Sequence, residues 1–351
     1  MTDIPEAAGE LAYKLLDLQA QMTWDRHGQM ALDNAKRNAR HFGKGESLAA
    51  LRGTQLGEGD NAVVIAAGPS IKRKDPAKLL RETGYRGAVI ATESAISYCL
   101  RNGIVPHLAV TIDPHATRVV RWLGDPYLTE EKLAQDDYFS RQDQDDAFAS
   151  EMKANEEILE LVNRHGKDIN IALSTMASEA LVERVMESGM NIFWWNPMLD
   201  DPDADDSISA ELMAENGFPT INAGGNVGTA SWMMADVLLE KAHVALTGID
   251  FAYYDDTPYF NTQYYYEALD LVGEENLDSL FVRIHNPYED AWFYTDPAYL
   301  WYRECFLEMV QDAECRTYNC TEGGILFGPG IDVMPLRRFL SDIASGTGPG
   351  R

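Results

Sequence analysis

A chain of 351 residues, 45% hydrophobic and 24% charged, has the composition of a folded globular protein with a sizeable core. It carries 56 acidic and 29 basic residues, for a net charge of −27. Such a surface repels nucleic acid and anionic membranes, so neither is expected as a partner. The start, MTDIPEAAGE, lacks the apolar stretch of a signal peptide, and no run of residues is long and apolar enough to span a membrane. The four cysteines form no CxxC pair, and we expect a cytoplasmic protein with reduced thiols.

The first 60 residues are predicted to be mainly helical and amphipathic. Leu11, Leu15, Leu18 and Met22 recur at a spacing of three to four residues, which is typical of one helix face. The pattern changes at 62–67, where the run AVVIAA is followed by glycine, proline and serine. A short, continuous and β-branched apolar run predicts a strand that is buried on both faces.

The rest of the chain alternates predicted strands with predicted helices. Strands are expected at 62–67, 88–91, 108–112, 169–173, 191–195, 219–222, 244–247 and 316–319, with helices of about ten residues between most of them. This order predicts right-handed βαβ crossovers. The expected fold class is therefore α/β, with a doubly wound, mainly parallel, Rossmann-like sheet.

The predicted domain organisation has three parts. A helical segment at 1–60 precedes a Rossmann-like domain at 61–345, and a disordered tail is expected at 346–351. An acidic, polar insertion is expected at 125–150, and the aromatic stretch 251–297 is predicted to be irregular.

Small and polar residues follow most of the predicted strands, at the edge where open parallel sheets bind ligands. Two glycine turns are the strongest candidates for nucleotide contacts, because glycine lets a phosphate approach the backbone and free amides can bind it. The alternatives are an ordinary turn at the first and helix capping by Asn226 at the second. The candidate ligand-binding residues are Gly68, Pro69, Ser70, Glu93, Gly224, Gly225, Asn226, Thr229, Thr321 and Gly323.

Three acidic residues are candidates for catalysis. Asp113 and Asp250 each follow a predicted strand, where a carboxylate can accept a proton, bind a hydroxyl or cap the next turn. Glu322 lies between residues typical of turns and is a further candidate for receiving a proton or a sugar hydroxyl. The tyrosines at 264–266 either cover a bound sugar or base, or only pack. No spacing of residues predicts a metal site.

Four segments carry a family resemblance, in order and over about residues 60–340. They read VVIAAGPSIKRKDPAKLL, VIATESAISYCLRNGIVPHLAVTIDP, NAGGNVGTASWMMADVLLEKAHVALTGIDFAYYDD and YNCTEGGILFGPGIDVMPL. They resemble the core domain of the motility-associated factor (Maf) flagellin glycosyltransferases, whose superfamily includes the MptE-like 6-hydroxymethylpterin diphosphokinases. The glycine-proline-serine element is also similar to that of bacterial sialyltransferases that use CMP-activated sugars.

The resemblance to Maf proteins implies transfer of a nonulosonic, sialic-acid-like sugar from a CMP donor to a protein Ser or Thr, with flagellin as the acceptor. It implies that the turn at Gly68 faces the nucleotide, that Glu93 and Asp113 line the pocket, and that the turn at Gly224 and Asp250 close it. No cofactor is then required.

Two alternatives stay open. An MptE-like diphosphokinase would use ATP and Mg²⁺. The resemblance to its archaeal members implies an aspartate pair after the third strand, but this chain has Asp113 alone at that place. The other alternative is a non-catalytic, flagellin-binding protein.

Overall fold

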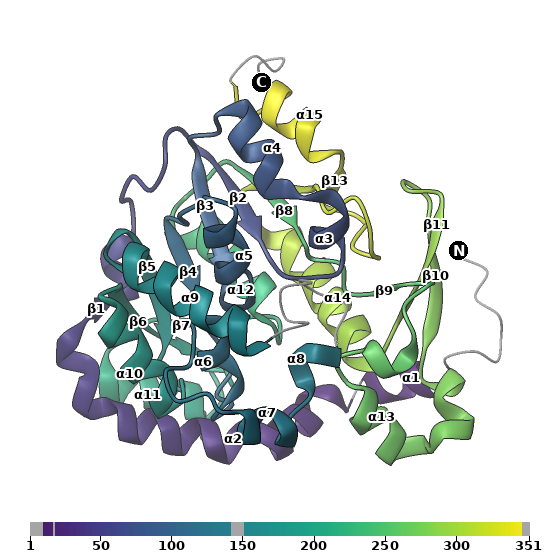
Figure 1. Ribbon diagram of the computed structural model, residues 1–351, viewed down its shortest axis with the longest axis horizontal. Coiled ribbons are helices and arrows are strands. Elements are labelled where there is room, and N and C mark those ends of the chain that lie inside the picture. Colours follow the sequence, from purple (N-terminus) through teal and green to yellow (C-terminus); the bar gives the residue numbers. More distant parts are fainter. Residues whose placement is uncertain (1–9, 17, 142–150, 346–351) are drawn as a thin grey trace.

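The computed structural model describes residues 10–16, 18–141 and 151–345. Within them a ten-stranded sheet has the order β1-β6-β5-β4-β3-β2-β8-β12-β13, with β7 paired to β6 (Figure 1). Every ladder of this sheet is parallel. The strands are β1 (Glu46–Ser47), β2 (Asn61–Ile65), β3 (Ala88–Thr92), β4 (Leu108–Val110), β5 (Asn170–Ser174), β6 (Asn191–Pro197), β7 (Thr220–Ile221), β8 (His243–Thr247), β12 (Arg316–Asn319) and β13 (Ile331–Val333).

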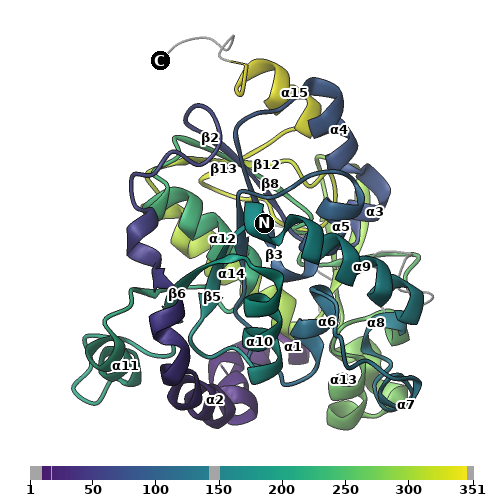
Figure 2. The same cartoon turned by 60° about the vertical axis from the view of Figure 1, so that its left-hand side comes forward.

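Helices cover both faces of the sheet, as the two views in Figures 1 and 2 show. Within β2, Val63 and Ile65 belong to one hydrophobic core, while Ala62 and Val64 belong to the other. Burial of alternate residues on opposite faces explains why the strand reads as an unbroken apolar run. One face packs against α3 (Ser70–Lys74), α4 (Pro76–Thr83), α5 (Ile96–Arg101), α6 (Arg118–Trp122), α9 (Glu151–His165), α10 (Glu179–Ser188) and α15 (Leu336–Asp342), and the other against α12 (Val227–Met233) and α14 (Pro297–Met309).

The strand order gives the sheet a switch point between β2 and β8. From β2 the chain proceeds through β3, β4, β5 and β6 in one direction, and β8, β12 and β13 lie on the other side of β2. The loops that leave β2 and β8 therefore diverge to opposite faces, which opens a crevice at their carboxyl ends. The predicted α/β, doubly wound, mainly parallel fold is confirmed.

The N-terminal segment contributes two helices and an edge strand. Helix α1 (Glu10–Leu16) and the longer α2 (Gln19–Asn38) precede β1, which pairs with β6. Two buried asparagines attach α2 to the ends of central strands: Asn34 donates to the carbonyls of Pro114 and Met176, at 3.0 and 2.9 Å. Asn38 donates to those of Thr175 and Ala177, at 2.9 and 2.7 Å. These bonds place α2 across the carboxyl ends of β4 and β5.

The prediction that 251–297 is irregular is wrong. This stretch contains β9 (Tyr253–Tyr254), α13 (Tyr265–Val272), β10 (Val282–Asn286) and β11 (Ala291–Thr295). The three strands form an antiparallel sheet in the order β10-β11-β9, on the right of Figure 1. Its aromatic and β-branched residues favour strands, and Tyr253, Phe281 and Tyr294 form a small core of their own. The aromatic residues of this stretch therefore build a second sheet.

The described part of the acidic insertion is helical, with α7 (Glu130–Gln135) and α8 (Tyr138–Arg141). Residues 142–150 of the insertion and the tail at 346–351 lie outside the described residues. A further helix, α11 (Ile208–Asn216), precedes β7. Among the described helices, none has the length and apolar character needed to cross a bilayer.

The attachment of α2 is testable through Asn38. Replacement by alanine removes both hydrogen bonds of a buried amide, and we expect the free energy of unfolding to fall by about 2 kcal/mol. Urea unfolding measures this change. Gln29→Ala, on the exposed face of the same helix, is the control and should shift stability by less than about 0.5 kcal/mol. Equal effects of the two substitutions would contradict the attachment.

Candidate functional site

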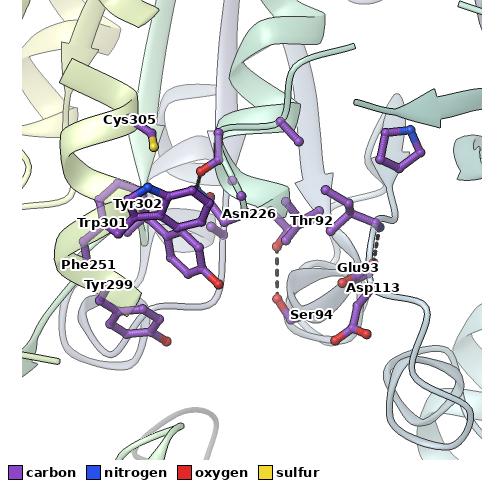
Figure 3. A pocket seen from close by; sticks show the side chains of 18 of the residues that line it. Thr92, Glu93, Ser94, Asp113, Asn226, Phe251, Tyr299, Trp301, Tyr302 and Cys305 are labelled. Carbon is purple, nitrogen blue, oxygen red and sulfur yellow. Dashed lines mark hydrogen bonds between the residues drawn. The ribbon is translucent and has the colours of Figure 1, made fainter. Parts of the chain in front are cut away.

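A large cleft opens at the switch point of the sheet. Its volume is about 870 Å³, within the range of small-molecule sites. Residues that follow β2, β3, β4 and β8 line it, together with the turn before α12 and residues of α2, α6, α8 and α14. Figure 3 shows aromatic side chains of α14 on one side of this pocket, and Glu93 and Asp113 on the other.

The two loops at the switch point are joined by Ser70 and Asp250. The Ser70 hydroxyl donates to Oδ2 of Asp250 at 2.7 Å, and the Ser70 amide donates to Oδ1 at 3.2 Å. Both residues are buried, with exposed fractions of 1% and 2%. The prediction that Ser70 is a ligand-binding residue is therefore corrected, since its hydroxyl and its amide both bind the carboxylate. Asp250 lines the cleft, and Ser70 lies behind it.

The preceding glycine is required by this arrangement. A Cβ atom on Gly68 would lie 2.1 Å from Oδ2 of Asp250 and 2.5 Å from the carbonyl oxygen of Gly248. Any larger residue would therefore separate the two loops. Gly68 and Pro69 both line the cleft, in agreement with their predicted position.

The second glycine turn lies beside the aromatic side of the cleft. Gly224, Gly225 and Asn226 all line the cleft, and Gly225 has a φ of +78°. A Cβ atom there would lie 2.4 Å from Cζ3 of Trp301, so glycine allows the aromatic ring to approach the turn.

Asn226 is also the N-cap of α12. Its Oδ1 accepts from the backbone amide of Thr229 at 2.9 Å, and its Nδ2 donates to the hydroxyl of Thr229 at 2.8 Å. The alternative that Asn226 caps the helix is therefore confirmed. Thr229 is buried and lies outside the lining of the cleft.

Two carboxyl groups lie near each other at the ends of β3 and β4. Glu93 is buried and accepts from the amide of Ile112 at 2.9 Å, while Asp113 accepts from the amide of His115 at 2.7 Å. Burial, reinforced by the nearby Asp113 carboxylate, raises the pKa of Glu93 well above its ordinary value. Glu93 therefore retains its proton at pH values at which an exposed glutamate is ionised.

Helix α14 supplies the aromatic side of the cleft. Tyr299, Trp301 and Tyr302 line it, together with Phe251 and Tyr264 from the chain before α13. The Tyr264 and Tyr302 hydroxyl oxygens are 3.0 Å apart. Of the tyrosines at 264–266, Tyr264 lines the cleft, whereas Tyr265 packs against the small antiparallel core and Tyr266 is exposed.

The charge of the cleft is strongly negative. Among the described residues that line it, Arg118 is the one basic side chain. Its Nε and Nη2 atoms lie 3.2 and 3.4 Å from the carboxylate oxygens of Asp136, and its guanidinium is 4.3 Å from the ring centroid of Tyr138. The acidic residues that line the cleft are Glu93, Asp113, Asp200, Asp201, Asp250, Glu308 and Asp312.

Besides Ser70 and Thr229, three further predicted site residues lie outside the lining of the cleft. Thr321 is buried and accepts from the amide of Ile249 at 3.3 Å. Glu322 accepts from the amide of Leu336, at the start of α15, at 3.1 Å. Gly323 packs against Tyr254 and the Asp250 carboxylate. This loop supports Asp250 and α15, so the structure gives Glu322 a capping position.

Sequence reasoning missed Arg118 and the aromatic residues of α14. The sequence around Trp301 predicted a packed helix, and nothing in that segment shows which face meets the cleft. Arg118 is one of many charged residues in a helical stretch. The signal in the sequence for an aromatic side of the cleft was the unusual density of tyrosine after Asp250.

The raised pKa of Glu93 makes stability depend on pH. The folded state keeps the Glu93 proton at pH values at which the unfolded chain has lost it. This contribution is complete below the ordinary pKa of glutamate and is lost as the pH rises toward the folded-state pKa. Glu93→Gln is neutral at every pH, so we expect its stability relative to the native protein to increase between about pH 5 and about pH 8.

Urea unfolding at the two pH values measures this change. Glu308→Gln, at an exposed position of the same cleft, is the control for removal of a carboxyl group from the cleft. Parallel pH profiles for the native protein and Glu93→Gln would contradict the assignment.

Comparison with known proteins gives two similarities. Residues 31–123 match a family model described as 6-hydroxymethylpterin diphosphokinase MptE-like. A solved structure of a Maf glycosyltransferase from Magnetospirillum magneticum AMB-1 aligns with 82% of this chain, at 13% identity and a TM-score of 0.46. The alignment covers 37% of that protein, so this chain spans little more than a third of its length. No curated protein sequence matches the chain. The resemblance to the MptE-like proteins is confirmed over the residues that the family model covers.

Proposed function

We propose that this chain is a glycosyltransferase that transfers a nonulosonic sugar from a CMP-activated donor to a hydroxyl group, with a Ser or Thr of flagellin as the acceptor. The observation that carries the proposal is the composition of the cleft, in which a glycine-lined switch point and two neighbouring carboxyl groups lie opposite an aromatic wall. Aromatic faces and carboxyl groups together suit a sugar, which has apolar ring faces and hydroxyl groups at its edge.

The two glycine turns are the proposed nucleotide-binding elements. Gly68 and Gly225 both line the cleft at the strand ends where open sheets bind nucleotides. The negative charge of the cleft favours a donor with one phosphodiester over a bare triphosphate. Asp250 holds the first turn through Ser70, so its proposed role is to position the turn.

Asp113 is the proposed proton acceptor. In the transfer step the acceptor oxygen forms a bond to the anomeric carbon of the sugar, and the bond from that carbon to the phosphate oxygen breaks. CMP leaves with the bonding electron pair, and the proton of the acceptor hydroxyl passes to the Asp113 carboxylate. Glu93 beside it keeps its own proton, so that the pair has one base and one neutral acid.

The diphosphokinase alternative is favoured by one specific observation, the proximity of Glu93 and Asp113. Mg²⁺ prefers oxygen ligands and is commonly held by one or two carboxylates together with substrate phosphates. Asp113, together with Glu93 once it has lost its proton, would supply these oxygen ligands, and bound Mg²⁺ would neutralise the charge of ATP phosphates. The family model that matches residues 31–123 carries the description of a diphosphokinase.

Nucleotide binding with and without metal distinguishes the two functions. We expect CMP to raise the melting temperature in the presence of EDTA, because the proposed contacts need no metal. Asp113→Asn should keep CMP affinity within about twofold but lower the release of CMP from CMP-N-acetylneuraminic acid by about 100-fold, as expected for loss of a general base.

Asp255→Asn, in the exposed ion pair with Arg283, is the matched control and should leave both quantities unchanged. Binding of ATP that requires Mg²⁺, with no response to CMP, would replace the glycosyltransferase by the diphosphokinase.

A further inference from the structure

A second groove lies outside the cleft, at the periphery of the molecule where Figure 1 places α13. Its volume is about 300 Å³, at the lower end of the range for small-molecule sites. We call it the α13 groove, and its lining consists of the buried Leu277 together with Tyr259, Phe260, Tyr265, Glu274, Glu275 and Asp278. None of these residues lines the cleft at the switch point, so the groove is distinct from the candidate functional site.

The three carboxyl groups of the α13 groove form no ion pair in the described part of the chain. Glu274 and Glu275 are exposed, and neither pairs with a described Lys or Arg. Asp278 is exposed as well, and it accepts a hydrogen bond from the hydroxyl of Tyr259 at 2.8 Å. Residues 242–282 contain no Lys or Arg. Three like charges around one groove repel one another, and a bound cation relieves this repulsion.

This lack of partners is a local feature. Just before Tyr259 in the sequence, Asp255 lies 2.6 Å from Arg283 and Asp256 lies 3.0 Å from Arg73. Acidic side chains next to β9 are thus compensated within the chain, while those of the α13 groove are not. The charge of the groove is therefore available to a molecule from outside this chain.

The aromatic residues supply the second half of the binding surface. Phe260 is 54% exposed. Tyr259 is held in place by Phe281, on which it stacks with ring centroids 4.1 Å apart, and by Asp278. Burial raises the pKa of the Tyr259 phenol to about 12, so it stays protonated at neutral pH and continues to donate to Asp278. The face of an aromatic ring carries partial negative charge and attracts a cation within about 6 Å.

Aromatic faces and carboxylates in one groove match a side chain with an apolar stem and a cationic end. Lys and Arg have this form, since their methylene stems lie along apolar surface while the charged end reaches an acid. A Ca²⁺ ion instead requires about six to eight oxygen ligands and gains nothing from the rings. The composition of the groove therefore favours an organic cation over a metal ion.

The surface around the groove favours a protein as the source of this cation. Tyr266 and Leu271 of α13 are 47% and 51% exposed, and Phe260 lies just before the same helix. Exposed apolar side chains that are grouped on one segment and rimmed by polar residues mark protein–protein interaction sites. Figures 1 and 2 both show α13 at the periphery of the molecule, where a partner can approach it. A small amine would leave these side chains uncovered.

We propose that the α13 groove binds a Lys or Arg side chain from a basic segment of a partner protein. The cationic end lies among the carboxylates of Glu274, Glu275 and Asp278, and the stem lies against Phe260. The inference is independent of the proposed function, because the groove and the cleft share no lining residue.

Fluorescence anisotropy measures the affinity of the full chain for a labelled peptide of alternating glycine and arginine, with a citrulline peptide as its uncharged counterpart. We expect the arginine peptide to bind and the citrulline peptide not to bind. Glu274→Gln together with Glu275→Gln should weaken binding about fivefold, as expected for the loss of two exposed charges. Phe260→Ala should weaken it about threefold, as expected for an exposed cation–π contact, with no change of net charge.

Two matched controls test whether the effect is local. Glu156→Gln together with Glu160→Gln removes the same charge from exposed positions of α9, and Tyr288→Ala removes an exposed ring from the loop between β10 and β11. Both should leave the affinity unchanged. All the substituted residues are exposed, so the melting temperatures of the variants should stay close to that of the native protein.

Equal weakening by the two glutamine pairs would reduce the binding to the overall negative charge and overturn the proposal. Unchanged affinity in Phe260→Ala, or no binding of the arginine peptide to the native protein, would overturn it as well. Calorimetric binding of Ca²⁺ that the substitution of Glu274 and Glu275 abolishes, with no peptide binding, would assign the groove to a metal ion instead. Dimerisation in sedimentation that Phe260→Ala abolishes would assign it to a second copy of the chain, again against the proposal.

Discussion

The two hydrogen bonds from Ser70 to Asp250 fix the place where the sheet changes direction. They join the loops that leave β2 and β8, which would otherwise diverge to opposite faces of the sheet. Helix α3 continues this connection, because Arg73 pairs with Asp256 at 3.0 Å and lies over the ring of Tyr254 at 3.9 Å. One short helix therefore positions both the first glycine turn and the start of the antiparallel sheet, and the geometry of the cleft depends on it.

The cleft joins two kinds of architecture. The parallel sheet contributes glycines and carboxyl groups at its strand ends, as its strand order dictates. The antiparallel sheet and α14 contribute aromatic rings. Some of these rings pack against one another in a small core, and others line the cleft. Trp301 lies against Gly225, where a Cβ atom would leave no room for its ring. Polar strand-end residues and aromatic side chains thus line the same cleft.

The sequence predicted the parallel sheet well because its strands are buried on both faces. Runs such as 62–67 contain only residues that a two-sided core accepts, and their order along the chain determines the sheet type. The position of Gly68, Glu93 and Asp113 at strand ends followed from that pattern. The role of Ser70 did not follow, since its partner lies 180 residues away and serine after a strand fits either a ligand or a bond within the protein. The aromatic wall was missed because the orientation of α14 depends on tertiary packing.

The buried asparagines of α2 also have a consequence for the order in which the protein folds during synthesis. Helix α2 is synthesised before its partners, because Asn34 bonds carbonyls that lie 80 and 142 residues further along the chain. Trp24 and Gly28 of the same helix line the cleft, whose opposite wall, around Trp301, is synthesised much later. The apolar face of α2 therefore stays uncovered until β5 has been synthesised and has joined the sheet. During this interval the nascent chain exposes a hydrophobic surface of the kind that chaperones bind, and the cleft becomes complete only after α14 has been made.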